Sequence, residues 1–345
     1  MQRESLTARL MAADRSQRRY RPEQGLATPP RAAAHLEQTA GVAEGLQQVI
    51  RQVGAVILGK ETQIRLTLAC LLARGHLLIE DLPGVGKTTL AHALANSLGL
   101  RFQRIQFTSD LLPADIIGVS IFDRHGGSFK FHPGPIFAQM ILADEVNRAT
   151  PKAQSALLEA MEEHQVTTEG ETRALPEPFF VIATQNPSYQ VGTFPLPESQ
   201  LDRFLMCLRL GYPDARAERV LLEGRDRRDM MAELKRWITA EELIALQQSV
   251  REVFAAPALY DYLQALILHT RQSPEFVTGL SPRSGLNLLH AARAWAFLEA
   301  RGHVLPEDVQ AVLPSVVGHR LQAADRQPRD SEDVARQLLA EVAVP

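Results

Sequence analysis

The chain has 345 residues, of which 45% are hydrophobic and 22% are charged, and its net charge is −3. This composition is typical of a globular protein with two or three domains and gives no general attraction to nucleic acid. No apolar run reaches about eighteen residues, so the sequence predicts no membrane span, and charges interrupt every apolar stretch that could act as a signal peptide. Cys70 and Cys207 lie in apolar segments, which favours core packing in a reducing cytosol over a disulfide.

Residues 1–35 are expected to form a basic, disordered segment. Residues 1–31 hold seven Arg and three acidic residues, a charge of +4 that leaves −7 for the rest of the chain. The stretch is rich in Arg, Pro and Ala and has weak periodicity, which favours disorder. A basic arm for a membrane or RNA, a plain tail and a mistaken start codon all remain open as interpretations.

Between residues 36 and 212, helix-like and strand-like patterns alternate. The segments with helical spacing of apolar residues are VGAVILGK (53–60), IRLTLACLLAR (64–74), TTLAHALANSLG (88–99) and the run after Thr150-Pro151. The segments expected as strands are HLLIE (76–80), FQRIQF (102–107), QMILADE (139–145) and FFVIATQN (179–186). Two hairpins are expected, at 117–133 with its turn at Gly126-Gly127, and at 165–175 with its turn at Glu169-Gly170. This alternation predicts an α/β fold with a mostly parallel sheet covered on both faces.

After residue 212 the strand-like runs disappear and helical periodicity continues to the end of the chain. Thr239 with Glu242 forms a capping box, and Ser281-Pro282 and Leu305-Pro306 are typical helix starts. We therefore expect residues 36–212 to form the α/β part of the chain and residues 213–345 to form an all-α domain.

The stretch EDLPGVGKTTL (80–90) matches a phosphate-binding loop except at its first position, where Asp81 replaces Gly. In such a loop, backbone N–H groups surround the phosphates, and glycines permit close approach. Lys87 would reach the β- and γ-phosphates and the Thr88 hydroxyl would ligate Mg²⁺. Because Asp tolerates the left-handed region, we expect Asp81 to cost about 1 kcal/mol in strain and to leave the loop functional. The expected nucleotide-binding residues are Pro83, Gly84, Val85, Gly86, Lys87, Thr88 and Thr89.

Further polar residues follow the buried strands. Asp144 and Glu145 end ILADE, where Asp144 would hold Mg²⁺ through water and Glu145 would polarise the attacking water. Asn186 ends FFVIATQN, where its amide would position that water. Each has a plainer alternative, since acidic residues at strand ends are often only solvated and Asn is common in turns.

Two arginines are candidates for neutralising phosphoryl charge. Arg203, in LPESQLDRFL, has the planar, permanently charged group that suits a transferring phosphoryl group, and a neighbouring subunit could supply it. Arg283 follows Ser281-Pro282 and could bring the helical domain to the nucleotide. The plainer alternatives are a local pair of Arg203 with Asp202 or Glu198, and an ordinary surface role for Arg283.

Three blocks of the sequence resemble the MoxR family of AAA+ ATPases. They are EDLPGVGKTTLA, FHPGPIFAQMILADEVNRATPKAQSALLEAMEEHQVTTEG and FFVIATQNPSYQVGTFPLPESQLDRFL, and the similarity resumes at GLSPRSGLNLLHAARAWAFLEARGHVLPEDV (279–309). The resemblance is nearly continuous from about residue 50 to 213 and does not cover residues 1–40. Asp81 at the first loop position is common in this family.

The resemblance implies an AAA+ αβα nucleotide-binding core with a helix 2 insert hairpin at about 117–133, followed by a small helical lid. It implies that Gly84 to Thr89 form the Walker A loop, Asp144 and Glu145 the Walker B pair, Asn186 sensor 1, Arg203 the arginine finger and Arg283 sensor 2. Arg148 is a second candidate for the trans-acting arginine. The implied protein is a cytoplasmic, hexameric, magnesium-dependent ATPase whose hairpins line the central opening.

By the same resemblance, the expected function is ATP-driven remodelling, maturation or activation of a protein complex, alongside a partner with a von Willebrand factor A domain. A magnesium-chelatase-type ATPase subunit is the enzymatic alternative, and it fits the quoted blocks less closely. A DNA motor lacks support from a basic core or interleaved aromatics. A scaffold that does not hydrolyse ATP would have no need for Lys87, Asp144, Glu145, Asn186 and Arg203 together.

Overall fold

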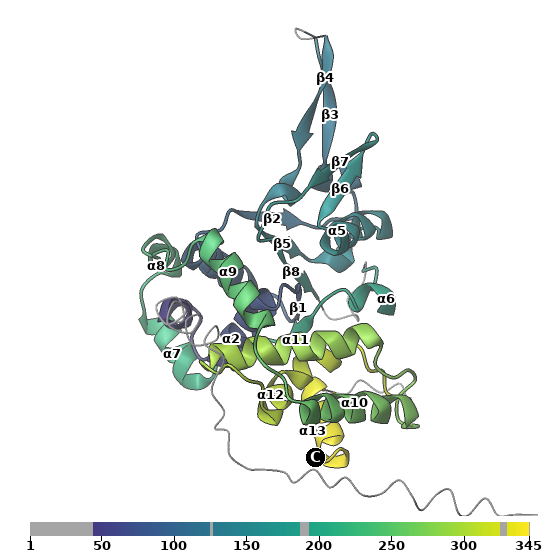
Figure 1. Cartoon of the computed structure of the whole chain (residues 1–345). Helices are drawn as coiled ribbons and strands as arrows, with labels where there is room; N and C mark the ends of the chain where they lie inside the picture. The colour runs from purple at the N-terminus through teal and green to yellow at the C-terminus, as the bar shows by residue number, and fades with distance from the viewer. Residues whose placement is uncertain (1–43, 125–126, 187–192, 325–329, 345) are drawn as a thin grey trace, which may run out of the picture. The chain divides into compact units, whose positions relative to one another are not determined.

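The computed structural model describes residues 44–124, 127–186, 193–324 and 330–344, and Figure 1 draws the other residues as a thin grey trace. All described residues belong to one unit of the chain, Thr39–Pro345. The segment 1–35, for which the sequence predicts disorder, therefore lies outside the described residues, as does Gly126 of the first expected turn.

A five-stranded sheet in the order β2-β5-β8-β1-β9 forms the centre of this unit, and all its strand pairs are parallel. The strands are β1 (Leu77–Glu80), β2 (Phe102–Gln106), β5 (Met140–Asp144), β8 (Phe180–Gln185) and β9 (Met206–Leu208). The predicted parallel sheet is thus confirmed, and four of its strands overlap segments expected as strands. The short β9 is an addition, because its three residues are too few to show a period.

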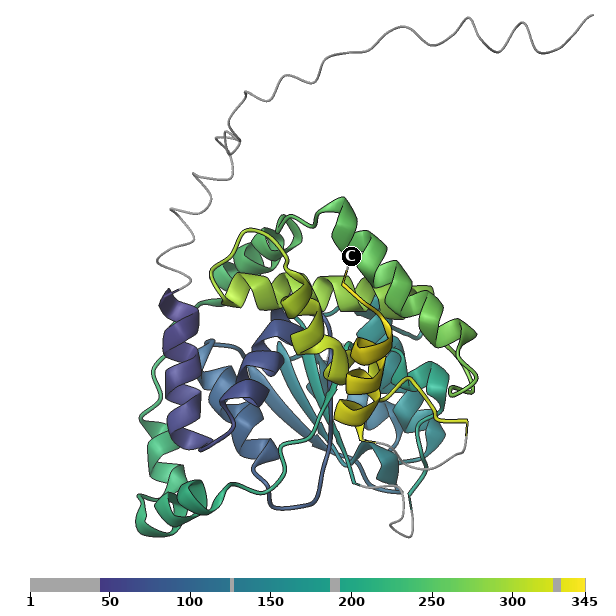
Figure 2. The ribbon, with the colours of Figure 1, turned by 90° about the horizontal axis from the view of Figure 1, so that it is seen from below.

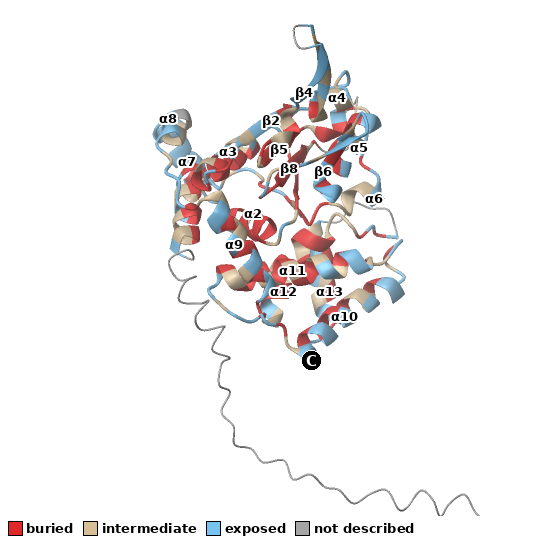
Figure 3. Cartoon of the chain, turned by 45° about the horizontal axis from the view of Figure 1, so that its top comes forward, coloured by how far each residue is buried: buried red, intermediate tan, exposed pale blue. Residues whose placement is uncertain are grey.

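Successive residues of the central strands point into two separate cores. On β5, Met140 and Leu142 belong to one hydrophobic core, and Ile141 and Ala143 belong to the other. This follows from the two-residue period of a strand, and it explains why a strand covered on both faces is apolar throughout. Figure 3 shows β5 and β8 in red, the colour of buried residues, along the middle of the unit.

Helices cover both faces of the sheet, as Figure 2 shows in a view along the sheet. One core contains residues of the helix over 44–56, of α2 (Glu61–Leu72) and of α3 (Lys87–Ser97). The other contains residues of α4 (Pro113–Ile117) and α5 (Pro151–Glu163). Thr150 caps α5 by accepting a hydrogen bond from the backbone of Ala153, at the start of the run expected to be helical.

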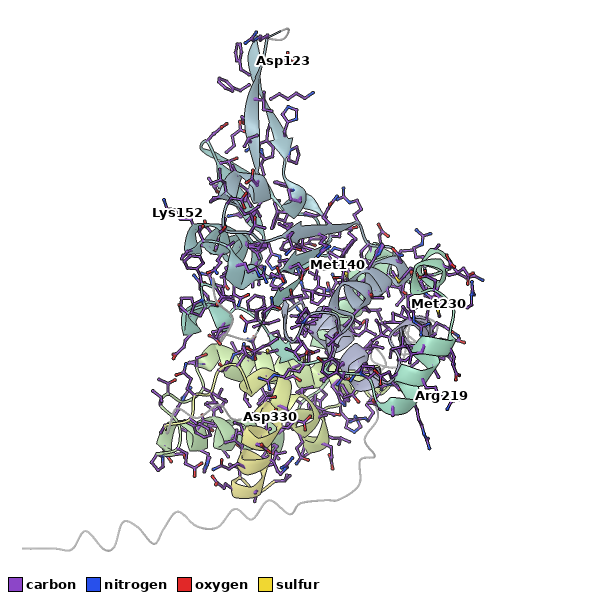
Figure 4. The ribbon with its side chains drawn as sticks, turned by 180° about the vertical axis from the view of Figure 1, so that it is seen from behind. Asp123, Met140, Lys152, Arg219, Met230 and Asp330 are labelled. Carbon is purple, nitrogen blue, oxygen red and sulfur yellow. The ribbon has the colours of Figure 1, made fainter. Side chains whose placement is uncertain are left out.

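Two antiparallel hairpins extend from this layered part. The first pairs β3 (Gly118–Asp123) with β4 (Ser128–Pro133), and the second pairs β6 (Gln165–Thr168) with β7 (Glu171–Ala174). Both agree with the predicted hairpins. In Figure 1 the β3–β4 hairpin projects away from the sheet, and Figure 4 places Asp123 near its outer end.

Beyond β9, every named element of the described chain is a helix. These are α7 (Ala215–Glu223), α8 (Arg227–Ala232), α9 (Ala240–Arg251), α10 (Pro257–Gln272), α11 (Pro282–Leu298), α12 (Pro306–Val317) and α13 (Ser331–Glu341), while the short α6 (Glu198–Leu201) precedes β9. The predicted capping box of Thr239 and Glu242 is present, and α11 and α12 start where the sequence predicts. Among the described helices, none is long and apolar enough to cross a membrane.

Candidate functional site

The carboxyl ends of β1, β5 and β8 meet at one edge of the sheet because these strands are parallel neighbours. The residues there surround a cavity of about 360 Å³. Its lining consists of Pro83, Gly84, Gly86, Lys87, Thr88, Thr89, Arg104, Asp144, Glu145 and Asn186. The structure therefore brings together nearly all the residues that the sequence assigns to the phosphate loop and the strand ends. Val85, the remaining loop residue, lines an adjacent cavity.

The loop before α3 has the backbone geometry that close approach of an anion requires. Gly84 and Gly86 have φ of +85° and +96°, in the left-handed region that favours glycine. A Cβ on Gly84 would have no atom within 4 Å, so the space in front of this backbone is open. Gly86 is the N-cap of α3, and no side chain caps that helix. The first N–H groups of α3 are thus available to an anion at the positive end of the helix.

Asp81 corrects one expectation from the sequence. Its φ is not in the left-handed region, so the expected strain does not arise. The buried carboxylate instead accepts backbone hydrogen bonds from Leu82 at 2.8 Å, Leu210 at 2.6 Å and Gly211 at 2.7 Å. Asp81 therefore ties the start of the loop to the chain after β9, a task that glycine could not perform.

Lys87, the first residue of α3, is buried at the cavity wall. Its Nζ donates to the carbonyl oxygens of Asp81 at 2.7 Å and Leu82 at 3.3 Å. Burial lowers the pKa of Lys87, while the charges of Asp81, Asp144 and Glu145 act in the opposite direction. The ammonium group is thus held at the base of the loop among carboxylates, where a polyphosphate would add further negative charge.

Asp144 ends β5 with both carboxylate oxygens engaged. Thr184 Oγ1 donates to one oxygen at 2.5 Å, and Arg104 donates to the other from Nε at 3.1 Å and from its terminal nitrogen at 2.5 Å. The β2–β5 and β5–β8 pairings bring these three residues together from neighbouring strands. These contacts fix the orientation of the Asp144 carboxylate at the end of β5.

Glu145 follows Asp144 with φ of +59°, which is rare for a residue with a side chain and costs strain of the kind found at functional sites. Its carboxylate accepts hydrogen bonds from Asn186 Nδ2 and Gln106 Nε2, each at 3.0 Å. Arg148 Nε lies 3.2 Å from the same carboxylate. The strand-end acid and the strand-end amide predicted from sequence are therefore in direct contact.

Magnesium fits this donor set. Thr88 and Asp144 supply one hydroxyl and one carboxylate at the same cavity, and Mg²⁺ characteristically takes one or two protein oxygens and completes its shell with water and phosphate oxygens. Within the described residues, no group of three or more His, Cys, Asp and Glu side chains could form a metal cage of protein ligands alone.

A second cavity of about 380 Å³ adjoins the first across the phosphate loop. It lies between the loop, the end of the helix over 44–56, and α7, and its lining includes Ile57, Val85, Tyr212 and Leu221. Lys60 Nζ donates to the carbonyl oxygen of Tyr212 at 2.8 Å, which fixes one wall. A mainly apolar slot next to a polar phosphate loop matches the two ends of a nucleotide.

Arg203 and Arg283 line neither cavity. Arg203 donates to the carbonyl oxygen of Leu158 at 2.6 Å, and Arg283 donates to Glu162 Oε1 at 2.6 Å. Leu158 and Glu162 are four residues apart on α5, so both arginines lie against the same helix about one turn apart. The sequence led us to expect Arg283 near the nucleotide of its own copy, and the structure does not bring it there.

Sequence patterns missed Arg104, which lines the cavity, and also Gln106 and Thr184, which hold the carboxylates of Glu145 and Asp144. Thr184 carried a usable signal, because it is a polar residue inside the otherwise apolar strand FFVIATQN. Arg104 and Gln106 carried none, since the polar positions of an alternating strand usually only face solvent. Only the pairing of β2 with β5 places them beside Asp144 and Glu145.

Comparisons with known proteins point to the same chemistry. A model of the ATPase family associated with various cellular activities (AAA) matches residues 76–206, and a model of the AAA lid domain matches residues 268–342. The chain is 45% identical over 303 residues to the uncharacterized protein YeaC of Bacillus subtilis, covering 87% of this chain and 95% of that protein. It is 39% identical over 301 residues to the chaperone MoxR1 of Mycobacterium tuberculosis, covering 83% and 79%. A crystal structure of a candidate ATPase from Cytophaga hutchinsonii is 34% identical, with a TM-score of 0.84, and the match covers 91% of this chain and 99% of that one.

Proposed function

Because the chain belongs to the MoxR-type AAA+ ATPases and hydrolyses ATP, we propose that it uses this hydrolysis to remodel, mature or activate a protein complex. The resemblance stated from sequence and the AAA+ fold with its lid are confirmed. The division at residue 212, the residue roles and the client are parts of the proposal.

In the proposed reaction, the residues around the first cavity bind the triphosphate. The loop over 83–89 surrounds it with N–H groups, and Lys87 moves its ammonium from the loop carbonyls to the phosphates. Thr88 and Asp144 hold Mg²⁺, which when bound neutralises phosphate charge. Burial of Lys87 strengthens its attraction to phosphate, because few waters compete there. The adjacent apolar cavity takes the base.

Glu145 is the proposed base that orients and polarises the attacking water. Its carboxylate already accepts hydrogen bonds from Asn186 and Gln106, so its orientation is fixed before the substrate arrives. Asn186 has an amide oxygen to offer the water while its Nδ2 holds Glu145. The contact between these two residues therefore couples the base to the strand that carries Asn186.

The arginines complete the reaction from a neighbouring copy. Within one copy, Arg203 and Arg283 lie against α5 and away from the cavity. We therefore place them on the nucleotide of the next subunit of a ring, which we propose to be a cytoplasmic hexamer. Arg148, the second candidate from sequence, instead lies against Glu145 of its own copy. An arginine placed in this way neutralises the charge that develops on the transferring phosphoryl group.

One observation carries the remodelling function: a hairpin with exposed apolar side chains projects from an ATPase core. Phe122 and Phe129 face each other across β3–β4 with ring centroids 5.3 Å apart, and they are 51% and 71% exposed. Exposed aromatic pairs are costly in water and are typical of surfaces that bind protein. The hairpin would transmit the motion of the core to a client, with a von Willebrand factor A domain protein as the proposed partner.

A retention experiment tests this function. The Glu145→Gln variant with ATP should hold its client, and the same variant with Phe122→Ser and Phe129→Ser should release it. In the background with Glu145 intact, the double Ser variant should keep the basal ATPase rate within about twofold, because the hairpin lies outside the cavity. Phe254→Ser is the matched control, since Phe254 is 60% exposed in the helical part. Retention that is equal with and without ATP, or that survives the loss of both rings, would contradict remodelling through this hairpin.

A further inference from the structure

The two arginines proposed to act in trans are joined by one carboxylate, that of Asp202. Asp202 is the C-cap of α6 and directly precedes Arg203. Its Oδ1 accepts hydrogen bonds from Arg320 Nε at 2.8 Å and Ser284 Oγ at 3.2 Å, and its Oδ2 accepts one from Ser281 Oγ at 3.3 Å. Ser281 and Ser284 flank Arg283 at the start of α11, so a single side chain connects the segments that carry both arginines.

Arg320 holds the backbone around Arg203, from Asp202 to Leu205, which we call the Arg203 segment. Its side chain is 4% exposed, and besides the Asp202 carboxylate it donates to the backbone carbonyls of Asp202 at 3.3 Å, Phe204 at 2.5 Å and Leu205 at 3.2 Å. These carbonyls lie on either side of Arg203. A planar guanidinium with several simultaneous partners holds a chain segment in one conformation, which the flexible ammonium of lysine would not do.

The charge balance explains why this arrangement depends on Asp202. A buried cation without a counter-charge is strongly unfavourable, and Asp202 is the carboxylate that forms an ion pair with Arg320 among the described residues. Asp202 itself is only 25% exposed. Removing its charge would leave Arg320 uncompensated and would free the start of α11 at the same time.

Both arginines also share a support on their other side. Arg203 contacts α5 at Leu158, and Arg283 contacts it at Glu162. The distance between the two arginines is therefore fixed both by α5 and by Asp202. In Figures 1 and 3, α6 lies between α5 and the helices α10 and α11. The start of α11 and the Arg203 segment are therefore connected at two places, Asp202 and α5.

We propose that Asp202, held by Arg320, is a positioning residue that keeps Arg203 and Arg283 as one unit for the neighbouring subunit's nucleotide. The proposal rests on the trans action described above. Asp202 lines neither cavity, so it acts on the nucleotide only by holding the two arginines in place. A misplacement of about 1 Å in such a group can reduce the rate roughly a hundredfold.

A double-mutant cycle on the full-length protein tests the positioning role. Asp202→Asn should lower kcat for ATP at least about tenfold, with KM and ATP affinity within about twofold of wild type. Asp202→Glu, which keeps the charge, should restore part of the rate. In a variant that already carries Arg203→Ala and Arg283→Ala, Asp202→Asn should cause no further loss, because the groups it positions are absent. Asp333→Asn, on exposed α13, is the matched control.

Three other results would contradict the positioning role of Asp202 or replace the first variant in the test. If Asp202→Asn keeps kcat within twofold, or lowers it by the same factor in the double arginine variant, the residue is structural and the inference is wrong. If Arg203→Ala and Arg283→Ala both keep the wild-type rate, the trans action fails and the positioning role fails with it. Should Asp202→Asn not fold, Ser284→Ala in the same cycle decides, with an expected loss of about threefold in the wild-type background and none in the double arginine variant.

Discussion

Two regions of one copy differ in where they place their charged groups: the cavity at the strand ends, and the two arginines, Arg203 and Arg283, that contact α5. The cavity collects its residues from three adjacent strand ends and the turn before α3, and these residues already contact one another. Arg203 and Arg283 are also held by hydrogen bonds, but their partners are residues of α5 and neither arginine lines that cavity. One copy therefore contains a nearly complete set of the residues proposed to bind ATP, and it holds the two arginines proposed to neutralise phosphoryl charge at a different place. Binding should depend on the first region alone, and turnover should depend on both.

The largest expected effect is that of Arg203→Ala on turnover. If the arginine serves the neighbouring subunit, its loss should lower kcat by about 10³-fold while ATP affinity stays nearly unchanged. Mixing Arg203→Ala with Glu145→Gln, each nearly inactive alone, should restore part of the turnover, because a site with intact Glu145 can then receive Arg203 from its neighbour. The measurement is ATPase rate against the mixing ratio, at constant total protein.

Arg336→Ala, at an exposed ion pair on α13, is the control, and when mixed with Glu145→Gln it should give a rate proportional to its own fraction. If the mixture of Arg203→Ala and Glu145→Gln never exceeded the rates of the separate variants, each subunit would work alone, and the contrast between the two regions would lose its functional meaning.

The second effect concerns Glu145→Gln, which tests the cavity side of the comparison. The amide keeps the size of the side chain and removes the charge that polarises water, so kcat should fall by roughly 500-fold while ATP binding persists. Glu163→Gln at the exposed end of α5 is the matched control. Turnover in Glu145→Gln near the wild-type rate would place the base on another residue.

How far the sequence predicted each region follows the same division. Lys87, Asp144, Glu145 and Asn186 could be predicted because each ends a short apolar strand or starts the following helix, and parallel strands bring such ends together. The neighbours of Arg283 could not be predicted, because its contact with Glu162 joins residues 121 positions apart. Such a contact depends on how α11 packs against the rest of the unit, which no local pattern encodes.

A third effect isolates binding. Lys87→Ala removes the buried ammonium from the loop, and we expect ATP affinity to fall by about 100-fold in calorimetry, which corresponds to roughly 2.7 kcal/mol. Lys152→Ala is the control, since Lys152 is exposed at the start of α5, where Figure 4 shows it pointing away from the protein. If Lys87→Ala bound ATP as wild type does, the phosphate loop would not be the binding element, and the first region would lose its role.

The smallest effect measures how closely the backbone approaches the phosphates. Gly84→Ala should lower the free energy of unfolding by about 1–2 kcal/mol, because φ of +85° is unfavourable for alanine even though the added Cβ meets no atom. Gly170→Ala in the second hairpin is a matched control, with φ of +80° and equally open space. Both variants should lose similar stability, but only Gly84→Ala should also lose about tenfold in ATP affinity, since its Cβ would occupy space that the nucleotide needs. Equal ATP affinities in the two variants would mean that the phosphates do not approach this backbone, and that the cavity binds its ligand through side chains alone.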